Sequence, residues 1–332
     1  RRVRQVVSSV PGSKFTVTVN GGESSFKSKQ TLQGFMAVFG GDVDTGLNDT
    51  VQLGDGVFAD DGSNVDGKGD YVLYEMPESA LPPVLDVSDY QALFGGVVAR
   101  GTASGPPSIV ADSFLSGNQD YATNSVSFSE AISVDANSVI KSYGDITFDD
   151  DATLNGPLTI EAGGSVTFTG KTDIPNDVTI IAGGSVVFSQ GVMSVGDDVA
   201  ITAGGNVSFK NQITFGSRTV IYAEQDISVA SGGSSSVSSA EGIAFLANRD
   251  VILNSNFNNF RGIIFSNGSI EFNANMDIYG LVVGNLGFDA ASNVNFLNDL
   301  SAYAWALEGT GIGIESFDVI LTRGTWSELS PL

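Results

Sequence analysis

The chain has 332 residues, of which 42% are hydrophobic and only 16% charged, and glycine occupies 41 positions. It contains neither cysteine nor histidine, which excludes disulfides, thiolate nucleophiles, catalytic pairs that need histidine, and nearly all zinc chemistry. The formal net charge is −23, so nucleic acid, whose phosphates require clustered lysine and arginine, is excluded as an expected partner.

The charge is unevenly divided between a basic N-terminal end and an acidic remainder. Residues 1–30 contain six cationic side chains and one acidic residue, Glu23. A basic end and an acidic body are complementary, so the end of one copy can meet the flank of another. The alternative is that the acidic surface serves solubility alone. The candidate assembly residues are Arg1, Arg2, Arg4, Lys14, Lys27 and Lys29.

No apolar run approaches the roughly 18 residues of a membrane-spanning helix, so no membrane span is expected in this chain. The chain begins at Arg1 instead of Met, and we interpret it as processed or truncated. An acidic, cysteine-free composition rich in glycine, serine, asparagine and aspartate is typical of extracellular proteins. We therefore expect an extracellular or cell-surface location.

Residues 1–118 are predicted to form a separate β-rich domain. Residues 15–19 alternate apolar and polar side chains as a strand does, and residues 71–74 form a short apolar run. Several prolines lie between residues 77 and 107, and residues 101–108 are typical of a linker. Such a domain can cap the first coil of a repeat structure and shield a sheet edge that would otherwise recruit another strand.

The richest acidic stretch, residues 42–70, combines aspartates with many glycines. Hard cations such as Ca²⁺ take several oxygen ligands from flexible, turn-rich loops, so this stretch is a candidate Ca²⁺ site. Solvated Asp-Gly turns are the alternative. Residues 64–75 have the glycine and glutamate spacing of an EF-hand loop, but Lys68 occupies a ligand position. The candidate ligands are Asp42, Asp44, Asp49, Asp55, Asp60, Asp61, Asp66 and Asp70.

A repeat of about twenty residues organises the second half of the chain. Residues 160–168, 180–188 and 201–209 each begin with Ile, continue with Ala-Gly-Gly from the third residue, and end with Val-x-Phe. The longest step between repeats contains the serine-rich loop 231–239. The same template recurs, in full or in part, at residues 140–148, 221–229, 245–253, 264–272 and 282–290.

Each column of the repeat has a physical interpretation. The residue two after the first Ile is always small, which predicts a cramped internal corner. The residue four after it is glycine in most repeats, which predicts a tight bend with positive φ. The residues six and eight after it are apolar and alternate with polar ones, which predicts a half-buried strand. The last column predicts an internal aromatic ladder of Phe148, Phe168, Phe188 and Phe209.

Each repeat therefore consists of strand, bend, strand and corner, and only stacked copies can bury its apolar face. We predict an all-β fold with a β-solenoid of about eight coils in residues 119–290, as a right-handed parallel β-helix of about 20 residues per coil. Residues 291–332 are predicted to form a C-terminal cap or a docking segment. A β-sandwich would explain the alternation but not the repeated Ala-Gly-Gly phase.

Over about residues 140–290 the chain resembles the haemagglutinin-type β-solenoid repeats of secreted bacterial adhesins and filamentous surface proteins. Their coils are similarly long, at about twenty residues, and have Ala-Gly-Gly-like bends. The resemblance implies an extracellular surface role. It supplies no catalytic residues to carry over to this chain.

Three further groups of residues carry possible chemistry. Residues 149–151 are three consecutive aspartates, and paired carboxylates on a β-helix can hydrolyse glycosides, although the equivalent corners of neighbouring coils lack them.

In the column three before the first Ile, Asp198 is expected to pair with Arg218 of the next coil, and Asp177 to remain solvated or share a cation. Aromatic side chains that either hold sugars or pack internally are Tyr143, Tyr222, Tyr279, Trp305 and Trp326.

Three functions remain open from the sequence. The first is a structural protein, a self-assembling subunit of a surface fibre, coat or appendage, whose partner is another copy of itself. The second is an adhesin or receptor-binding spike that recognises surface glycans or a host surface. The third, a polysaccharide lyase or hydrolase, is the least supported, and we expect no enzyme. An ice-binding face would need regular ranks of threonine, and none recurs in the repeat.

Overall fold

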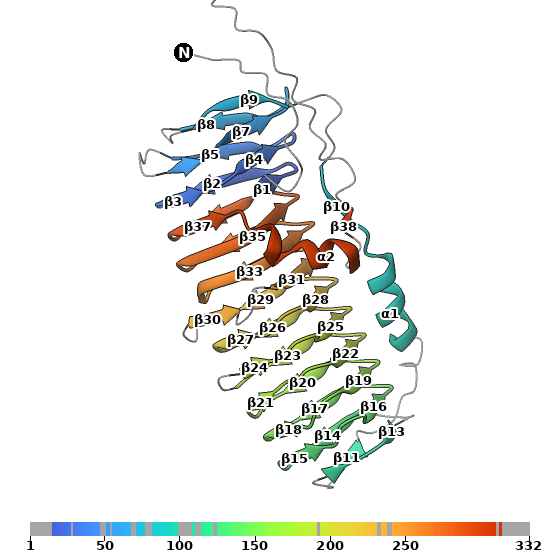
Figure 1. Cartoon of the computed structure of the whole chain (residues 1–332). Helices are drawn as coiled ribbons and strands as arrows, with labels where there is room; N and C mark the ends of the chain where they lie inside the picture. Colours follow the sequence, from blue (N-terminus) through green and yellow to red (C-terminus); the bar gives the residue numbers. More distant parts are fainter. Residues whose placement is uncertain are drawn as a thin grey trace, which may run out of the picture.

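The computed structural model describes residues 15–27, 29–46, 51–53, 55–67, 71–76, 82–98, 108–109, 114–121, 125–190, 193–230, 234–237, 241–309 and 312–313. The fold is all-β, with 54% strand and 5% helix. Its parallel strands stack as a β-solenoid of about 12 turns at roughly 20 residues per turn (Figure 1), which confirms the predicted fold class. At about 4.8 Å per strand, about 12 turns form a rod roughly 55 Å long.

A full turn contributes one strand to each of three sides of the solenoid. In one turn these strands are β16 (Val139–Ser142) on side 1, β17 (Ile146–Phe148) on side 2 and β18 (Ala152–Leu154) on side 3. Equivalent strands of successive turns pair in parallel and keep the register of the repeat, so that Ile140, Ile160 and Ile180 are aligned.

The strands of each side follow one another from one end of the rod to the other. Side 1 contains, in order, β13 (Asn118–Tyr121), β16, β19 (Leu158–Ala162), β22 (Val178–Ala182), β25 (Ala200–Ala203), β28 (Thr219–Ala223), β31 (Ile243–Ala247), the second halves of β33 (Asn256–Ser266) and β35 (Met276–Gly284), β1 (Phe15–Val19), β4 (Phe35–Val38), β7 (Gly56–Ala59) and β9 (Leu73–Glu75). Side 2 contains β11 (Ser108–Ile109), β14 (Val126–Phe128), β17, β20 (Val166–Phe168), β23 (Val186–Phe188), β26 (Val207–Phe209), β29 (Ile227–Val229), β32 (Val251–Leu253), β34 (Ile270–Phe272), β36 (Phe288–Ala290), β2 (Glu23–Phe26), β5 (Asp42–Asp44) and β8 (Asn64–Asp66). Side 3 contains β12 (Phe114–Leu115), β15 (Ile132–Val134), β18, β21 (Thr172–Asp173), β24 (Met193–Val195), β27 (Ile213–Phe215), β30 (Ser234–Val237), the first halves of β33 and β35, β37 (Val294–Leu297), β3 (Gln30–Leu32) and β6 (Gln52–Leu53).

The interior of the solenoid is filled by the inward side chains of all three sides. On side 2 these include a ladder of stacked rings whose centroids lie 4.7–5.1 Å apart. The ladder confirms the prediction for Phe148 to Phe209 and extends it by Phe128. At β29 valine replaces phenylalanine, and Phe215 of side 3 packs edge-to-face against Phe209 at 5.4 Å. The neighbouring side thus supplies the volume that the ladder lacks there.

The small residues two positions after the first Ile lie where side 1 turns toward side 2. All of them point inward, and the prediction of a cramped corner is confirmed. The residues that are at most 3% exposed are Ser142, Ala162, Ala182, Ala203, Ala223, Ala247 and Ser266.

The repeated glycines four positions after the first Ile do not have positive φ, so the predicted reason for them is wrong. The cause is a close approach between coils. A Cβ on Gly184 would lie 2.5 Å from the Oγ of Ser165 on the preceding coil, and a Cβ on Gly205 would lie 2.5 Å from the Oγ of Ser185. Glycine is therefore needed because no side chain fits.

The side chains that press against these glycines form a hydrogen-bonded corner ladder. Each accepts a bond from the backbone N–H of the equivalent residue one coil further on, as when Ser165 N donates to Asp145 Oδ1 at 2.7 Å and Ser185 N donates to Ser165 Oγ at 3.1 Å. The ladder satisfies backbone donors that the corner leaves without a strand partner. The accepting members are Ser125, Asp145, Ser165, Ser185, Asn206, Asp226 and Asp250, and Ser269 ends the ladder as the donor to Asp250.

The chain does not fill the rod in sequence order. Strands β1 to β9 stack on the last coil, β35 to β37, at the opposite end from β11 (Figure 1). From β9 the chain returns along side 1 through β10 (Val84–Leu85) and α1 (Ser88–Val98) before the coils begin at β11. The division at residues 118 and 290 stays a prediction. In space, the strands of residues 15–76, hereafter the N-terminal block, continue the same three sides.

A second apolar cluster covers the outer face of side 1. From β28 to β35 the outward side chains of this side that form the cluster are apolar, among them Tyr222, Leu246 and Phe265, all 0% exposed. They are covered by β10, by η2 (Leu300–Ala302) and α2 (Ala304–Gly309), and by β38 (Ile312–Gly313), which pairs with β10. A sheet buried on both faces needs apolar residues on both, which explains why the alternation fades there. None of the helices in the described ranges is both long and apolar enough to cross a membrane.

Candidate functional surface

The outer surface of side 2 carries short polar side chains in regular ranks. The residue at the centre of each strand points outward, between two buried neighbours. These outward residues are mainly serine and threonine from β14 onward, and they become mainly acidic toward the N-terminal block. In order they are Ser127, Thr147, Thr167, Val187, Ser208, Ser228, Ile252, Glu271, Asp289, Ser25, Asp44 and Asp66.

The aspartates of residues 42–70 are spread over several parts of the N-terminal block. Asp42, Asp44 and Asp66 lie on side 2, where Asp44 is the register partner of Asp66. Asp55 lies in the turn before β7, and Asp60 and Asp61 follow that strand. Asp49 and Asp70 lie outside the described residues.

Among the described aspartates, Asp44 and Asp66 accept backbone bonds within tight turns, and Asp60 accepts one from the neighbouring coil. Asp44 Oδ1 accepts from Gly46 N, and Asp66 Oδ1 from Gly67 N, both at 2.7 Å. Asp60 Oδ1 accepts from Gly40 N at 3.0 Å. Within the part of the chain that the structure describes, no three side chains of the metal-binding types converge. These contacts favour the Asp-Gly turn alternative, and Ca²⁺ binding stays a prediction.

Of the six candidate assembly cations, Lys27 and Lys29 lie in the described residues, and Arg1, Arg2, Arg4 and Lys14 lie outside them. Lys27 forms an ion pair with Asp289 of the last coil. The basic end therefore meets the acidic body at this point within one chain, where the N-terminal block stacks on β36.

The three consecutive aspartates occupy the corner between sides 2 and 3 and are exposed. Asp149 accepts a bond from Ser127, and Asp151 Oδ1 accepts from Lys171 N on the next coil at 2.7 Å. Asp150 Oδ1 accepts from Asp151 N at 2.8 Å. All three thus accept local hydrogen bonds, and that of Asp151 is of the kind that the corner ladder makes.

The pairing expected in the charged column is confirmed. Arg218 donates to both carboxylate oxygens of Asp198, at 2.6 Å and 2.5 Å, and also pairs with Glu241. The hydrogen bond from Arg218 holds the pKa of Asp198 below its usual value. Asp177, Asp198 and Arg218 all have φ near +55°, since this corner turns through the left-handed region. The column therefore fixes the corner between coils.

Three of the candidate aromatic residues, Tyr222, Tyr279 and Trp305, contact other parts of the chain. Tyr222 is 0% exposed and stacks on Tyr90 of α1, with centroids 4.4 Å apart. The Arg261 guanidinium lies 4.8 Å from the centroid of Tyr279. Trp305 is half-buried and donates to Ala302 O, and Tyr143 is likewise half-buried. Trp326 lies outside the described residues.

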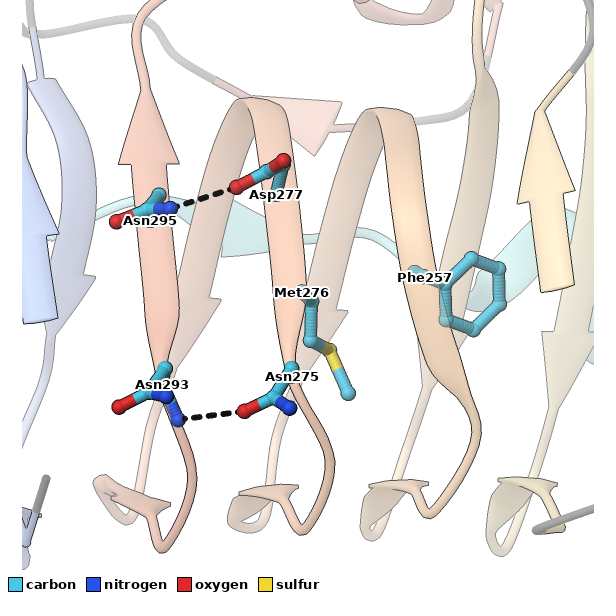
Figure 2. A pocket seen from close by; sticks show the side chains of 6 residues that line it. All are labelled: Phe257, Asn275, Met276, Asp277, Asn293 and Asn295. Carbon is cyan, nitrogen blue, oxygen red and sulfur yellow. Dashed lines mark hydrogen bonds between the residues drawn. The ribbon is translucent and has the colours of Figure 1, made fainter. Parts of the chain in front are cut away.

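A small hollow opens on side 3 near the last coils (Figure 2). It has a volume of about 160 Å³, and Phe257 and Met276 line it together with polar side chains. Asn295 donates to Asp277 Oδ1 at 2.7 Å, and Asn293 N donates to Asn275 Oδ1 at 3.3 Å, as the dashed lines of Figure 2 show. Its lining contains one carboxylate, that of Asp277, which already accepts a hydrogen bond. The hollow therefore provides no pair of a general acid and a general base.

The two ends of the rod present strand edges. At one end β11, β12 and β13 pair with the next coil on one edge only, and at the other end the same is true of β6, β8 and β9. Among the described residues, no strand covers the outer edges of these six strands. Such edges expose backbone donors and acceptors that can pair with another strand. These edges could not be located from the sequence, because the chain order does not reveal which coil is terminal.

No protein family and no curated protein matches the sequence. Among solved structures, the chain is similar to an ice-binding protein from an Antarctic bacterium of the Flavobacteriaceae, with 10% sequence identity and a TM-score of 0.23. The alignment covers 86% of this chain and 96% of that one. A likeness this slight carries no inference about function. The β-solenoid architecture that the haemagglutinin-type resemblance implied is confirmed, and membership of that family stays a prediction.

Proposed function

We propose that the chain is an extracellular structural protein, a rod-shaped subunit that assembles with copies of itself into a surface fibre, coat or appendage. The observation that carries the proposal is the pair of parallel strand edges at opposite ends of one rod. The outer edges of β11, β12 and β13 in one copy can pair with the outer edges of β8, β6 and β9 in the next copy. Repeated pairing gives a filament.

Both ends carry exposed carboxylates, and this sets the conditions for assembly. Asp120 lies on β13 at one end, and Asp61 and Asp66 lie at the other. Like charges repel, and salt or divalent cations screen them. Filaments should therefore be promoted by salt and by Ca²⁺. A chelator distinguishes the two causes: filaments that dissolve at constant salt depend on Ca²⁺ binding by residues 42–70, and filaments that persist depend on screening.

The edge of β13 can be blocked without breaking its existing pairing. Val139 N donates to Gly117 O at 3.0 Å, so the backbone groups of residues 117 and 119 point toward β16 and those of residues 118 and 120 point to the outer edge. Proline at position 120 removes an outer N–H only. We expect Asp120→Pro to abolish filaments in electron microscopy and Asp120→Ala, which keeps the N–H, to retain them.

Equal filament formation by Asp120→Pro and Asp120→Ala would contradict pairing through this edge. Separate rods in every buffer would contradict self-assembly itself. The proposal of an adhesin would then take its place, because the hydroxyls of side 2 form a regular polar surface along the rod, and glycan binding would be measured next. We also propose that the chain is not an enzyme; polysaccharide turnover that disappears in an Asp149→Ala, Asp150→Ala, Asp151→Ala variant would refute this.

A further inference from the structure

The N-terminal block joins the rest of the rod at an interface that has no covalent continuity. Elsewhere, a coil is followed along the chain by the coil stacked upon it. At the joint, defined by β1 to β3 on β35 to β37, the partners are distant in sequence, as Val17 is aligned with Val282 and Ser25 with Asp289. The block and the last coil are thus held together by contacts that two separate molecules can also make.

These contacts are numerous and polar as well as apolar. Gln30 Nε2 donates to the carbonyl oxygens of Ala290 and Ser292 at 3.1 Å and 2.8 Å. Asn20 Nδ2 donates to Asn285 Oδ1 at 2.5 Å. The rings of Phe26 and Phe288 meet edge-to-face at 4.9 Å. Lys27 adds its ion pair with Asp289.

The joint is also shaped for its partner. A Cβ on Gly22 would lie 2.1 Å from Leu286 O, and a Cβ on Gly287 would lie 2.3 Å from Glu23 O, so glycine on each side permits the close fit. The last coil therefore offers a surface that accepts this N-terminal block specifically. The occupant that fits is a second copy of the block, because it brings the same residues.

The block is itself a unit of stacked strands. It has its own parallel pairs, β1 with β4, β4 with β7 and β7 with β9, and its own aromatic cluster, in which Phe58 stacks on Tyr74 and Phe35 meets both edge-to-face. It connects to the strap formed by β10 and α1 through residues 77–83. The strap is held separately on side 1, by the β10–β38 pairing and by Tyr90 on Tyr222.

We propose that copies of this chain exchange N-terminal blocks, so that the block of one copy occupies the joint on the last coil of another. The inference rests on the proposed self-assembly and adds a second contact between copies to the pairing of rod ends. Exchange replaces each contact with an identical one, which makes it a low-cost route to association. Closure within one chain is favoured at low concentration, since a short connection gives a high effective concentration, and exchange is favoured at high protein concentration.

The absence of native cysteine makes a disulfide test of this exchange clean. Thr31 and Asn295 are register partners across the joint and are half-exposed. Neighbouring parallel strands lie about 4.8 Å apart, within reach of a disulfide. Full-length Thr31→Cys and Asn295→Cys chains are refolded together at high concentration and oxidised, and we expect a covalent heterodimer.

The matched control pair is Ser133→Cys with Thr153→Cys, which are register partners on two consecutive coils. Mixed in the same way, this pair is expected to give no heterodimer, because its two strands belong to coils that follow one another along the chain. Heterodimer formed equally by both pairs, or by neither, would overturn the inference. If either joint variant misfolds, Ser25→Cys with Asp289→Cys provides the same test on side 2.

The double variant Thr31→Cys, Asn295→Cys separates this inference from the proposed function. Oxidised as a dilute monomer, it locks each block onto its own chain. Loss, in the locked form, of the association between copies at high protein concentration, with recovery on reduction, supports exchange. Unchanged assemblies of the locked form, together with their loss in Asp120→Pro, would refute exchange and leave pairing of the ends intact. No assembly of the wild-type chain would refute the proposed function alone, since the heterodimer test does not require filaments.

Discussion

At the scale of single residues, the corner between sides 1 and 2 depends on one crowded contact in the coils that have glycine four residues after the first Ile. The ladder residue of one coil presses against the glycine of the next, and its oxygen accepts the following N–H, as Ser165 does between Gly184 and Ser185. Two residue types are thus fixed together: an acceptor with a short side chain, and a glycine that leaves room for it. A substitution at either position disturbs the other.

We predict that Gly184→Ala lowers the stability of the rod by about 1–3 kcal/mol, because the new Cβ overlaps Ser165 Oγ. The urea midpoint, followed by circular dichroism, measures the change. The same substitution at Gly95 of α1, where a Cβ would meet nothing within 4 Å, should stabilise the chain by up to about 1 kcal/mol. In a Ser165→Ala background the effect of Gly184→Ala should shrink, and an unchanged effect would assign it to backbone contacts instead.

In a repeat, the position of a residue predicts its structural role better than its residue type does. The phenylalanine ladder could be predicted because alternation along a strand determines which side chains point inward. The corner ladder could have been found from the fifth position after the first Ile. This position is Ser, Asp or Asn in every repeat from Asp145 to Ser269. The role of Gly184 could not be predicted, because the contact that excludes a side chain is made with a different coil.

At the scale of elements, the strap is held on side 1 by a small set of contacts around Tyr222. Its hydroxyl bonds to Glu224, which also accepts from Gln91 Nε2 of α1 and from Asn248 Nδ2, both at 3.1 Å. Burial raises the pKa of Tyr222, and the neighbouring Glu224 raises it further. Burial likewise raises the pKa of Tyr90, with a contribution from Asp89.

These shifts predict that the strap loosens in alkali. Because the folded-state pKa values exceed the ordinary value of 10.0, the two hydroxyls favour the folded state fully below about pH 10, and this contribution is lost as the pH rises above it. We expect the urea midpoint to fall as the pH is raised from about 10 to about 12, and to fall less in Tyr90→Phe, which keeps the ring stack. An equal fall in both proteins would show that other groups dominate.

The placement of the elements was less predictable than their existence. The solenoid follows from a period of about twenty residues, which is a local property of the sequence. The stacking of β1 on β35 joins residues 265 apart and leaves no period, and residues 15–76 do not follow the template. The candidate Ca²⁺ ligands illustrate the same limit, since Asp44 and Asp60 are close in sequence yet lie on successive coils.

At the scale of the whole molecule, each coil contacts chiefly its two neighbours, so the stability of the rod is a sum of nearest-neighbour terms. The phenylalanine ladder links five successive coils, from Phe128 near one end to Phe209. A break in its middle should divide the rod into two parts that unfold separately. A break at its end should affect the end alone.

We therefore predict different outcomes for two similar truncations. Phe188→Ala and Phe128→Ala each remove a ring that is 1% exposed, at about 3–5 kcal/mol in a close-packed core. Hydrogen exchange should show faster opening of coils on both sides of position 188 in the first variant, and only of the end coils in the second. A uniform increase along the rod in both variants would mean that the solenoid unfolds as a single cooperative unit.

The discontinuous path of the chain has a consequence for its synthesis. The N-terminal block leaves the ribosome first, but the coil on which it docks is completed only when residue 297 has been made. At about 5–20 residues per second, the roughly 220 residues between them take about 10–45 seconds to translate. During that interval nascent chains on one messenger carry finished blocks next to unfinished rods. The order of translation thus brings together, in time and place, blocks and open coils from different copies.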